Sequence, residues 1–124
     1  MKYVAAVSAA VVIGGCAVGP QPLPVQAFPE LPMAPGLCQG GSVRNALVTV
    51  GPRYPRAALD VGQTGWVIIY FDVASDGSTS DIGVAASSPP GVFEAAGVNA
   101  LRQWKFAPGS PRIKCRLDFT FKLQ

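Results

Sequence analysis

Apolar and polar residues alternate along three stretches of the chain, and this spacing is typical of β-strands that bury one face. The stretches cover residues 66–73, roughly 79–86, and 112–123. Asp76-Gly77 lies between the first two stretches, and an Asp-Gly pair in such a place is a strong signal for a hairpin turn. The pattern therefore predicts an antiparallel hairpin that is followed, later in the chain, by a third strand.

Each predicted strand has an expected core face. In the first strand this face carries Val67, Ile69, Phe71 and Val73, and in the second it carries Ile82, Val84 and Ala86. In the last strand the expected core residues are Ile113, Cys115, Leu117, Phe119, Phe121 and Leu123. The residues of this strand that are expected to face water are Arg112, Lys114, Arg116, Asp118, Thr120 and Lys122.

Two segments are predicted to be helical. Residues 52–62 contain Pro55, which suits the first turn of a helix, and Gly62, which suits the position just after its end. Residues 92–104 carry apolar side chains at helical spacing, and Pro108 ends this element. The order helix, strand, strand, helix, strand predicts an α+β fold, a small three-stranded antiparallel sheet with two helices packed on one face.

The N-terminal residues have the anatomy of a signal peptide, with a single lysine ahead of an apolar run at residues 3–13. Ile13-Gly14-Gly15-Cys16 resembles a bacterial lipobox, so residues 1–15 are expected to be removed and the cysteine to be lipidated. Plain secretion, with cleavage after Ala17, and an uncleaved anchor stay open as alternatives. The lipid-anchored chain is expected on the periplasmic side of the bacterial envelope, with the outer membrane favoured over an inner-membrane anchor.

Residues 16–41 are rich in proline and glycine and carry a single charge, that of Glu30. Proline lacks an amide donor and has a fixed φ, so this stretch is not expected to form a helix or a central strand. We expect a semi-rigid, extended tether here, and a folded domain over residues 42–124.

Apart from the lipobox cysteine, the sequence contains Cys38, where the tether meets the domain, and Cys115, near the start of the last strand. A secreted chain enters an oxidising compartment, in which two remaining cysteines usually pair. The sequence therefore predicts a disulfide that closes a long loop, for which the chain-entropy model gives a stabilisation of about 4 kcal/mol. The absence of a CxxC pair disfavours redox catalysis.

The composition argues against several classes of function. The sequence has no histidine, which excludes Ser-His-Asp and Cys-His catalysis and histidine-ligated zinc. Its carboxylates form no pair at catalytic spacing, so we expect no enzymatic activity, no cofactor and no metal. The net charge of +3 comes from 10 basic and 7 acidic residues. Because the basic residues are scattered, they indicate solubility and not nucleic-acid binding.

The predicted domain resembles the C-terminal domain of TonB-type proteins over about residues 50–124. As in that family, the first helix opens on a Tyr-Pro pair, the hairpin has an Asp-Gly turn, and the second helix is followed by a Trp-x-Phe-x-Pro run. The residues that carry the resemblance include Tyr54, Pro55, Gly62, Gly65, Asp76, Gly77, Trp104, Phe106 and Pro108.

This resemblance implies a periplasmic, non-enzymatic binding domain that engages an outer-membrane TonB-dependent transporter, or another envelope protein, by β-strand addition. A short segment of the transporter adds to the edge of the last strand, where backbone groups provide affinity and alternate side chains provide selectivity. Charges on this strand also protect a free edge against aggregation, and the two roles are compatible. The edge residues implied here are Lys114, Arg116, Asp118, Thr120 and Lys122.

The sequence departs from a full energy transducer of that family. The resemblance implies that such a transducer has a long tether behind an inner-membrane helix. That helix carries a histidine-containing signature for contact with the ExbB–ExbD motor. This sequence has no histidine, and the predicted tether is short. The chain is therefore not expected to transduce the proton-motive force by itself.

A second apolar stripe, Trp66, Ile68 and Tyr70, lies on the sheet face opposite the expected core. A solvated antiparallel sheet normally carries polar residues there. The stripe is explained either by a homodimer or partner surface, or by cover from the tether, with Phe28 or Leu31 as candidates. The alternative function is therefore a structural envelope lipoprotein that self-associates or binds a cell-wall component.

Overall fold

The computed structural model describes residues 20–39, 41–43 and 46–123. The expected signal peptide and the expected lipidation site at Cys16 lie outside the described residues. The elements, in chain order, are β1 (Leu37–Cys38), β2 (Gly41–Ser42), β3 (Ala46–Val48), α2 (Arg56–Asp60), β4 (Gly65–Val73), β5 (Thr79–Ser88), α3 (Glu94–Arg102), β6 (Lys105–Phe106) and β7 (Arg112–Phe121).

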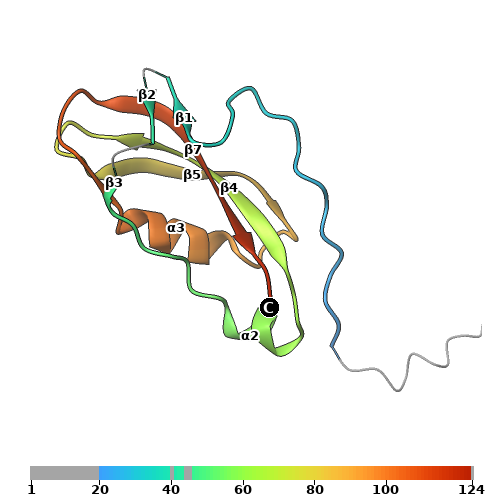
Figure 1. Cartoon of the computed structure of the whole chain (residues 1–124). Coiled ribbons are helices and arrows are strands. Elements are labelled where there is room, and N and C mark those ends of the chain that lie inside the picture. The colour runs from blue at the N-terminus through green and yellow to red at the C-terminus, as the bar shows by residue number, and fades with distance from the viewer. Residues whose placement is uncertain (1–19, 40, 44–45, 124) are drawn as a thin grey trace, which may run out of the picture.

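The main sheet has three antiparallel strands in the order β5-β4-β7, with β4 in the centre (Figure 1). The Asp-Gly turn joins β4 to β5, and Gly77 adopts a φ of +90° there. Asp76 accepts hydrogen bonds from the Ser78 hydroxyl at 2.6 Å and the Ser78 amide at 2.9 Å. These bonds lower the pKa of Asp76 and hold the turn closed.

Two further sheets, β1–β2 and β3–β6, are antiparallel pairs. Each of their strands is two or three residues long. Alternation over so few residues leaves no recognisable pattern in the sequence, so these strands were not predicted. The α+β class that the sequence predicts is confirmed.

Helices α2 and α3 lie on one side of the main sheet (Figure 1). Gly97 of α3 faces β4, where an added β-carbon would lie 3.0 Å from Ile69 Cδ1 and 3.4 Å from Val67 Cγ1, so the missing side chain permits close packing. The Phe93 ring stacks on Phe121 of β7 with centroids 4.3 Å apart. The buried core consists of Cys38, Ala58, Val67, Ile69, Phe71, Val73, Phe93, Leu101, Phe106, Cys115 and Phe121.

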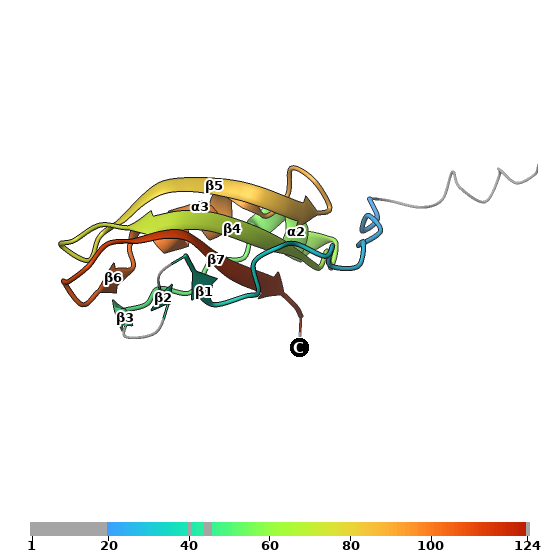
Figure 2. The same ribbon diagram turned by 90° about the horizontal axis from the view of Figure 1, so that it is seen from above.

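Residues 20–36, here called the strap, cross the opposite side of the sheet (Figure 2). The Phe28 ring stacks on Trp66 with centroids 4.6 Å apart, and Trp66 Nε1 donates a hydrogen bond to the Gln26 carbonyl at 2.7 Å. The buried Gln63 side chain is hydrogen-bonded to both the amide and the carbonyl of Leu23. The described part of the expected tether is therefore extended, but it is held against the sheet.

The prediction that Ala86 shares the core face of β5 is wrong. Val84 pairs with Ile69 and Ala86 pairs with Ile68, and neighbouring residues of β4 point to opposite sides of the sheet. Val84 therefore lies on the helix side, but it is 40% exposed and not part of the core. Ala86 lies on the strap side. The reason is a bulge at Ala85, because one extra residue in a strand reverses the alternation beyond it.

The expected faces of β7 are corrected at three positions. Ile113 and Leu123, predicted in the core, are 46% and 41% exposed, whereas Arg116, predicted in water, is only 6% exposed. A register shift against β4 and a positive φ of 51° at Lys114 interrupt the alternation next to Ile113. Leu123 follows the end of the strand. Arg116 does lie on the face away from the helices, but the strap covers that face.

Candidate binding edge

The outer edge of β7 is the edge that does not pair with β4. Arg116, Asp118 and Thr120 lie opposite Tyr70, Ile68 and Trp66 in the β4–β7 register. The Arg116 carbonyl accepts a hydrogen bond from the Gly36 amide at 2.9 Å, so it points away from β4. Backbone groups alternate in direction along an antiparallel strand, and those of Asp118 and Thr120 therefore also point outward.

The first half of this edge is already occupied by the chain itself. The Gly36 amide donates to the Arg116 carbonyl, and the Gln39 amide donates to the Ile113 carbonyl at 2.8 Å. Between these two hydrogen bonds, a disulfide joins Cys38 to Cys115. The two cysteines are 77 residues apart in the sequence, and the disulfide attaches β1 to β7.

The second half of the edge is open. Within the described ranges, the backbone groups of Asp118 and Thr120 make no backbone hydrogen bond other than those of the β4–β7 pairing. The Thr120 side chain is exposed, and Lys122 just beyond the strand is exposed as well. An extended segment of another chain would therefore find unpaired outward donors and acceptors at these residues.

The charges on β7 are not all available to a partner. The Arg116 guanidinium donates two hydrogen bonds to the Asp118 carboxylate, at 2.8 and 2.9 Å, and a third to the Met33 carbonyl at 2.7 Å. The hydrogen bonds to Asp118 raise the pKa of Arg116. These two residues neutralise each other and hold the strap, whereas Lys114 and Lys122 are exposed.

The opposite edge of the sheet, formed by β5, is less suited to accept a strand. Its register against β4 shifts twice, and Asp81 has a positive φ of 48°. Bulges of this kind bend an edge strand and interrupt the regular spacing of its backbone groups. Residues 115–121 of β7 pair with β4 without a register shift, so this part of β7 is the better candidate.

The aromatic residues that carry the family resemblance hold the fold together. Tyr54 packs edge-to-face against Phe93 and Phe121, and its hydroxyl donates a hydrogen bond to the Gln63 carbonyl. Burial raises the pKa of this hydroxyl. Trp104 Nε1 donates to the Val50 carbonyl at 3.0 Å. These side chains connect the first helix and the segment before it to the core.

The glycines of the resemblance allow close backbone approach. A β-carbon at Gly65 would lie 2.2 Å from the Ser88 carbonyl oxygen, and one at Gly77 would lie 1.9 Å from that of Phe106. Gly62 follows α2 and has a φ of +69°, in the left-handed region that favours glycine. Their contribution is therefore to packing and chain direction.

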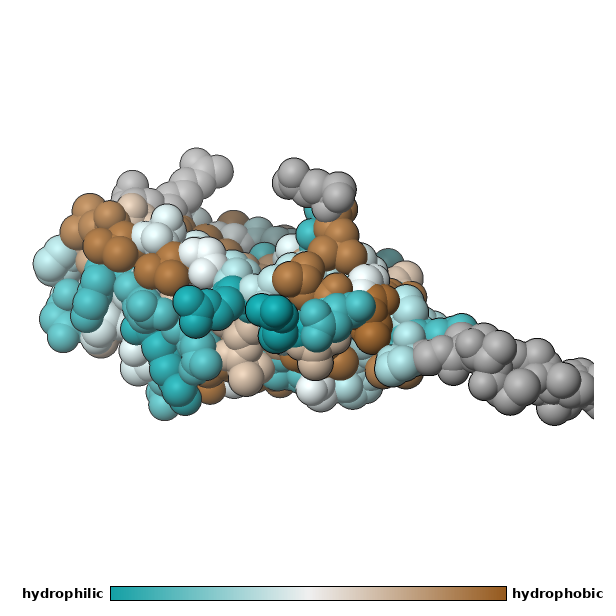
Figure 3. All heavy atoms as spheres, turned by 90° about the horizontal axis from the view of Figure 1, so that it is seen from below, coloured by the Kyte–Doolittle hydropathy of each residue, from teal (hydrophilic) through white to brown (hydrophobic). Residues whose placement is uncertain are grey.

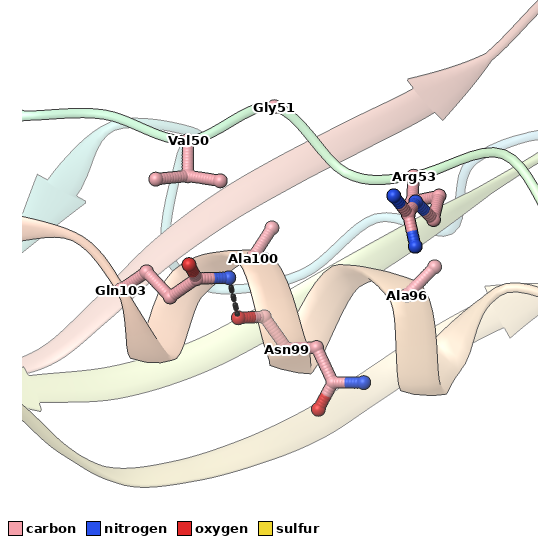
Figure 4. Close-up of a pocket in the computed structure, with 7 residues that line it drawn as sticks. All are labelled: Val50, Gly51, Arg53, Ala96, Asn99, Ala100 and Gln103. Carbon is pink, nitrogen blue, oxygen red and sulfur yellow. Dashed lines mark hydrogen bonds between the residues drawn. The ribbon is translucent and has the colours of Figure 1, made fainter.

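A groove of about 510 Å³ runs between α3 and the segment before α2 (Figure 4). Figure 4 shows Arg53 and Ala96 at one end, Val50 and Gln103 at the other, and Gly51 between Val50 and Arg53. Seen from below, the surface carries hydrophilic residues with separate hydrophobic groups between them (Figure 3). Arg53 is the only ionisable side chain that lines the groove, so its lining provides no acid–base pair.

The remaining expectations concern metals and membranes. Among the described residues, no group of three histidine, cysteine, aspartate or glutamate side chains is placed to hold a metal ion. No helix in the described part of the chain is both long and apolar enough to cross a membrane. Of the apolar stripe, Trp66 is 5% exposed and Ile68 is fully buried. Phe28 stacks on Trp66, so cover from the tether, one of the two expected explanations, holds at Trp66.

Sequence reasoning missed the contacts that Met33, Gly36 and Gln39 make with β7. These contacts use backbone amides and carbonyls, which every residue has, so residue type carries no signal for them. The predicted pairing of Cys38 with Cys115 was the only signal that pointed to this place.

Comparison with known proteins identifies the domain. Residues 50–123 match the family described as Gram-negative bacterial TonB protein C-terminal. The chain belongs to this family. Protein TonB of Escherichia coli (strain K12) is 32% identical over 72 residues, which are 58% of this chain and 30% of that protein. Protein tonB2 of Pseudomonas aeruginosa is 37% identical over 57 residues, 46% of this chain and 21% of that protein.

Solved structures show the same relationship. The chain resembles the solution NMR structure of the Pseudomonas aeruginosa TonB C-terminal domain with a TM-score of 0.59 and 32% identity, over 64% of this chain and 85% of that one. It resembles a structure of the TonB2 protein from Vibrio anguillarum with a TM-score of 0.56 and 26% identity, over 82% of this chain and 98% of that one.

The matched segments cover about a third or less of the curated TonB relatives. Within this chain, the TonB C-terminal family match begins at residue 50. The strap, β1 and Cys38 therefore lie outside the matched residues, whereas β7 and Cys115 lie inside them.

Proposed function

We propose that this chain is a non-enzymatic binding module of the periplasm, which engages an outer-membrane transporter, or another envelope protein, by accepting a partner strand on β7. The observation that carries the proposal is the open outer edge at Asp118 and Thr120. Strand addition of this kind uses backbone hydrogen bonds for affinity and neighbouring side chains for selectivity. Membership of the TonB C-terminal family supports a role in TonB-dependent transport.

The proposal includes an anchor at the membrane through lipidated Cys16. A disulfide between Cys38 and Cys115 fits a protein that works in an oxidising compartment. We propose an output domain that contacts the transporter and does not itself transduce the proton-motive force.

In-cell photo-cross-linking tests the proposal. A photo-reactive amino acid replaces Thr120 in the full chain, intact cells are illuminated, and mass spectrometry identifies the captured protein. The matched control carries the same amino acid at Asp81, which is exposed on the opposite edge of the sheet. We expect Thr120 to capture an outer-membrane transporter near its N-terminus and Asp81 to capture none. Equal capture from both positions, or capture of only this chain or a wall-associated protein at Thr120, contradicts the proposal.

A further inference from the structure

We propose that residues 36–39 act as a built-in strand that the Cys38–Cys115 disulfide fixes on β7, so that a partner strand is admitted only beside residues 117–121. The inference rests on the proposed function, because it specifies where on β7 the partner pairs. It concerns a segment that lies outside the family match.

The built-in strand runs antiparallel to β7. From Gly36 to Gln39 the segment advances by three residues, while its partners on β7 go back by three, from Arg116 to Ile113. Gln39 and Ile113 also form an antiparallel bridge. The order is antiparallel, but the spacing of three residues departs from the two-residue alternation of a regular ladder, and Lys114, with its positive φ of 51°, lies between the two carbonyls on β7. The segment nevertheless occupies the outward carbonyls of Arg116 and Ile113, which a partner strand would need.

The built-in strand ends at Gly36 for a local reason. Gly36 has a φ of +81°, and the Leu37 amide donates to the Ala34 carbonyl at 3.2 Å, so the chain turns there. Before this turn the strap leaves the edge and crosses the face of the sheet, where Arg116 binds the Met33 carbonyl. The edge beyond Arg116 is consequently left uncovered.

The uncovered half sets limits on the partner. A strand beside residues 117–121 is only about four to five residues long. On the helix side its side chains lie next to Leu117 and Phe119, which are half-buried. On the strap side they lie next to Thr120 and the Arg116–Asp118 pair. The edge therefore fits a short extended segment with an apolar residue beside Phe119.

The role of the disulfide in this arrangement can be tested by removing it. Two backbone hydrogen bonds alone compete weakly with a partner strand, because each contributes only about 1 kcal/mol in water. The covalent bond keeps the segment at the edge whether or not those hydrogen bonds open. Removal of the disulfide should therefore extend the part of the β7 edge that a partner strand can reach, toward Arg112.

Photo-cross-linking at two positions of the full chain, in intact cells, tests the inference. The photo-reactive amino acid replaces either Thr120 or Ile113, in the wild type and in the Cys38→Ser/Cys115→Ser variant. We expect capture of the transporter from Thr120 in both proteins, and from Ile113 only in the variant. Capture from Ile113 in the wild type at the level of Thr120, or its absence in the folded variant, overturns the inference while the proposed function stands.

Amide hydrogen exchange provides a second measurement that needs no partner. The Gln39 amide should exchange slowly in the wild type and about tenfold faster in the double variant, whose folding is checked by near-ultraviolet circular dichroism. Reduction of the wild-type disulfide with a phosphine gives the same comparison without substitution, if the variant does not fold. Equal exchange with and without the disulfide overturns the inference. If Thr120 captures no transporter, the proposed function fails, and Gln39 exchange alone decides whether the disulfide holds the segment.

Discussion

Arg116 illustrates how the surroundings of one residue change its role. By alternation it lies on the face away from the helices, and in the absence of the strap it would be an ordinary solvated charge. The strap buries it, and the Asp118 carboxylate and the Met33 carbonyl satisfy its donors. A buried guanidinium without these partners would be unstable, since an unpaired buried charge is costly to desolvate. The same residue therefore organises the edge and holds the strap.

Glu94 supplies a prediction on pH dependence. Burial raises the pKa of Glu94, but hydrogen bonds from the Gly91 amide at 2.8 Å and the Ser87 hydroxyl at 2.7 Å outweigh it, so the pKa is lowered in the folded protein. A group with a lowered pKa in the folded state contributes stability above its ordinary pKa. That contribution is lost as the pH falls through the lower, folded value.

We expect Glu94→Gln to lower the free energy of unfolding by about 1 kcal/mol at pH 7, because the charge-assisted hydrogen bonds are weakened. The difference from wild type should shrink as the pH is lowered to 3, since the stability that the ionised carboxylate contributes is lost progressively as the pH falls below its ordinary pKa. Thermal melting at both pH values measures this. Glu30→Gln, at an exposed position of the strap, is the control and should change little. An equal loss at both pH values contradicts the prediction.

At the scale of elements, register decides which residues meet. The pattern locates β4, β5, α3 and β7 because each is long enough for its alternation or helical spacing to show. It does not locate the bulges in β5 and β7, since a bulge arises from backbone pairing between strands. The expected faces therefore hold for β4 and become wrong beyond Ala85 and next to Lys114.

A pair of glycines tests the packing of the main sheet. Gly65→Ala should lower the free energy of unfolding by about 2 kcal/mol or more, because the new β-carbon would meet the Ser88 carbonyl oxygen at 2.2 Å. Gly83→Ala, in the neighbouring strand, is the matched control, because nothing lies within 4 Å of its β-carbon position. Urea denaturation of both variants measures the difference. Similar losses in the two would contradict the close contact at Gly65.

For the molecule as a whole, the strap and the disulfide determine what is exposed. The strap covers Trp66, and Ile68 on the same face is fully buried, so this apolar face is not available for self-association. Residues 36–39 cover half of the outer edge of β7. The uncovered edge beside Thr120 is short, and short free edges limit edge-to-edge aggregation.

The strap contact has a direct test. Phe28→Ala removes the ring that stacks on Trp66, and the hydrogen bond from Trp66 Nε1 to Gln26 should then open more often. We expect the indole proton of Trp66 to exchange with solvent about tenfold faster in NMR spectra. The indole proton of Trp104, bonded to Val50, serves as the internal control, and Val25→Ala as the control substitution. Unchanged exchange at Trp66 would contradict a role of Phe28 in holding the strap.

The sequence by itself determined the α+β class, the hairpin, the longer helix, the last strand and the family, because these depend on spacing and residue type within short stretches. It also pointed to the pairing of Cys38 with Cys115. Only the tertiary structure decided that the tether lies on the sheet, that Arg116 is buried and that residues 36–39 of the same chain occupy half of the β7 edge. Those features depend on backbone hydrogen bonds between residues far apart in the chain, and a backbone amide is the same group in almost every residue.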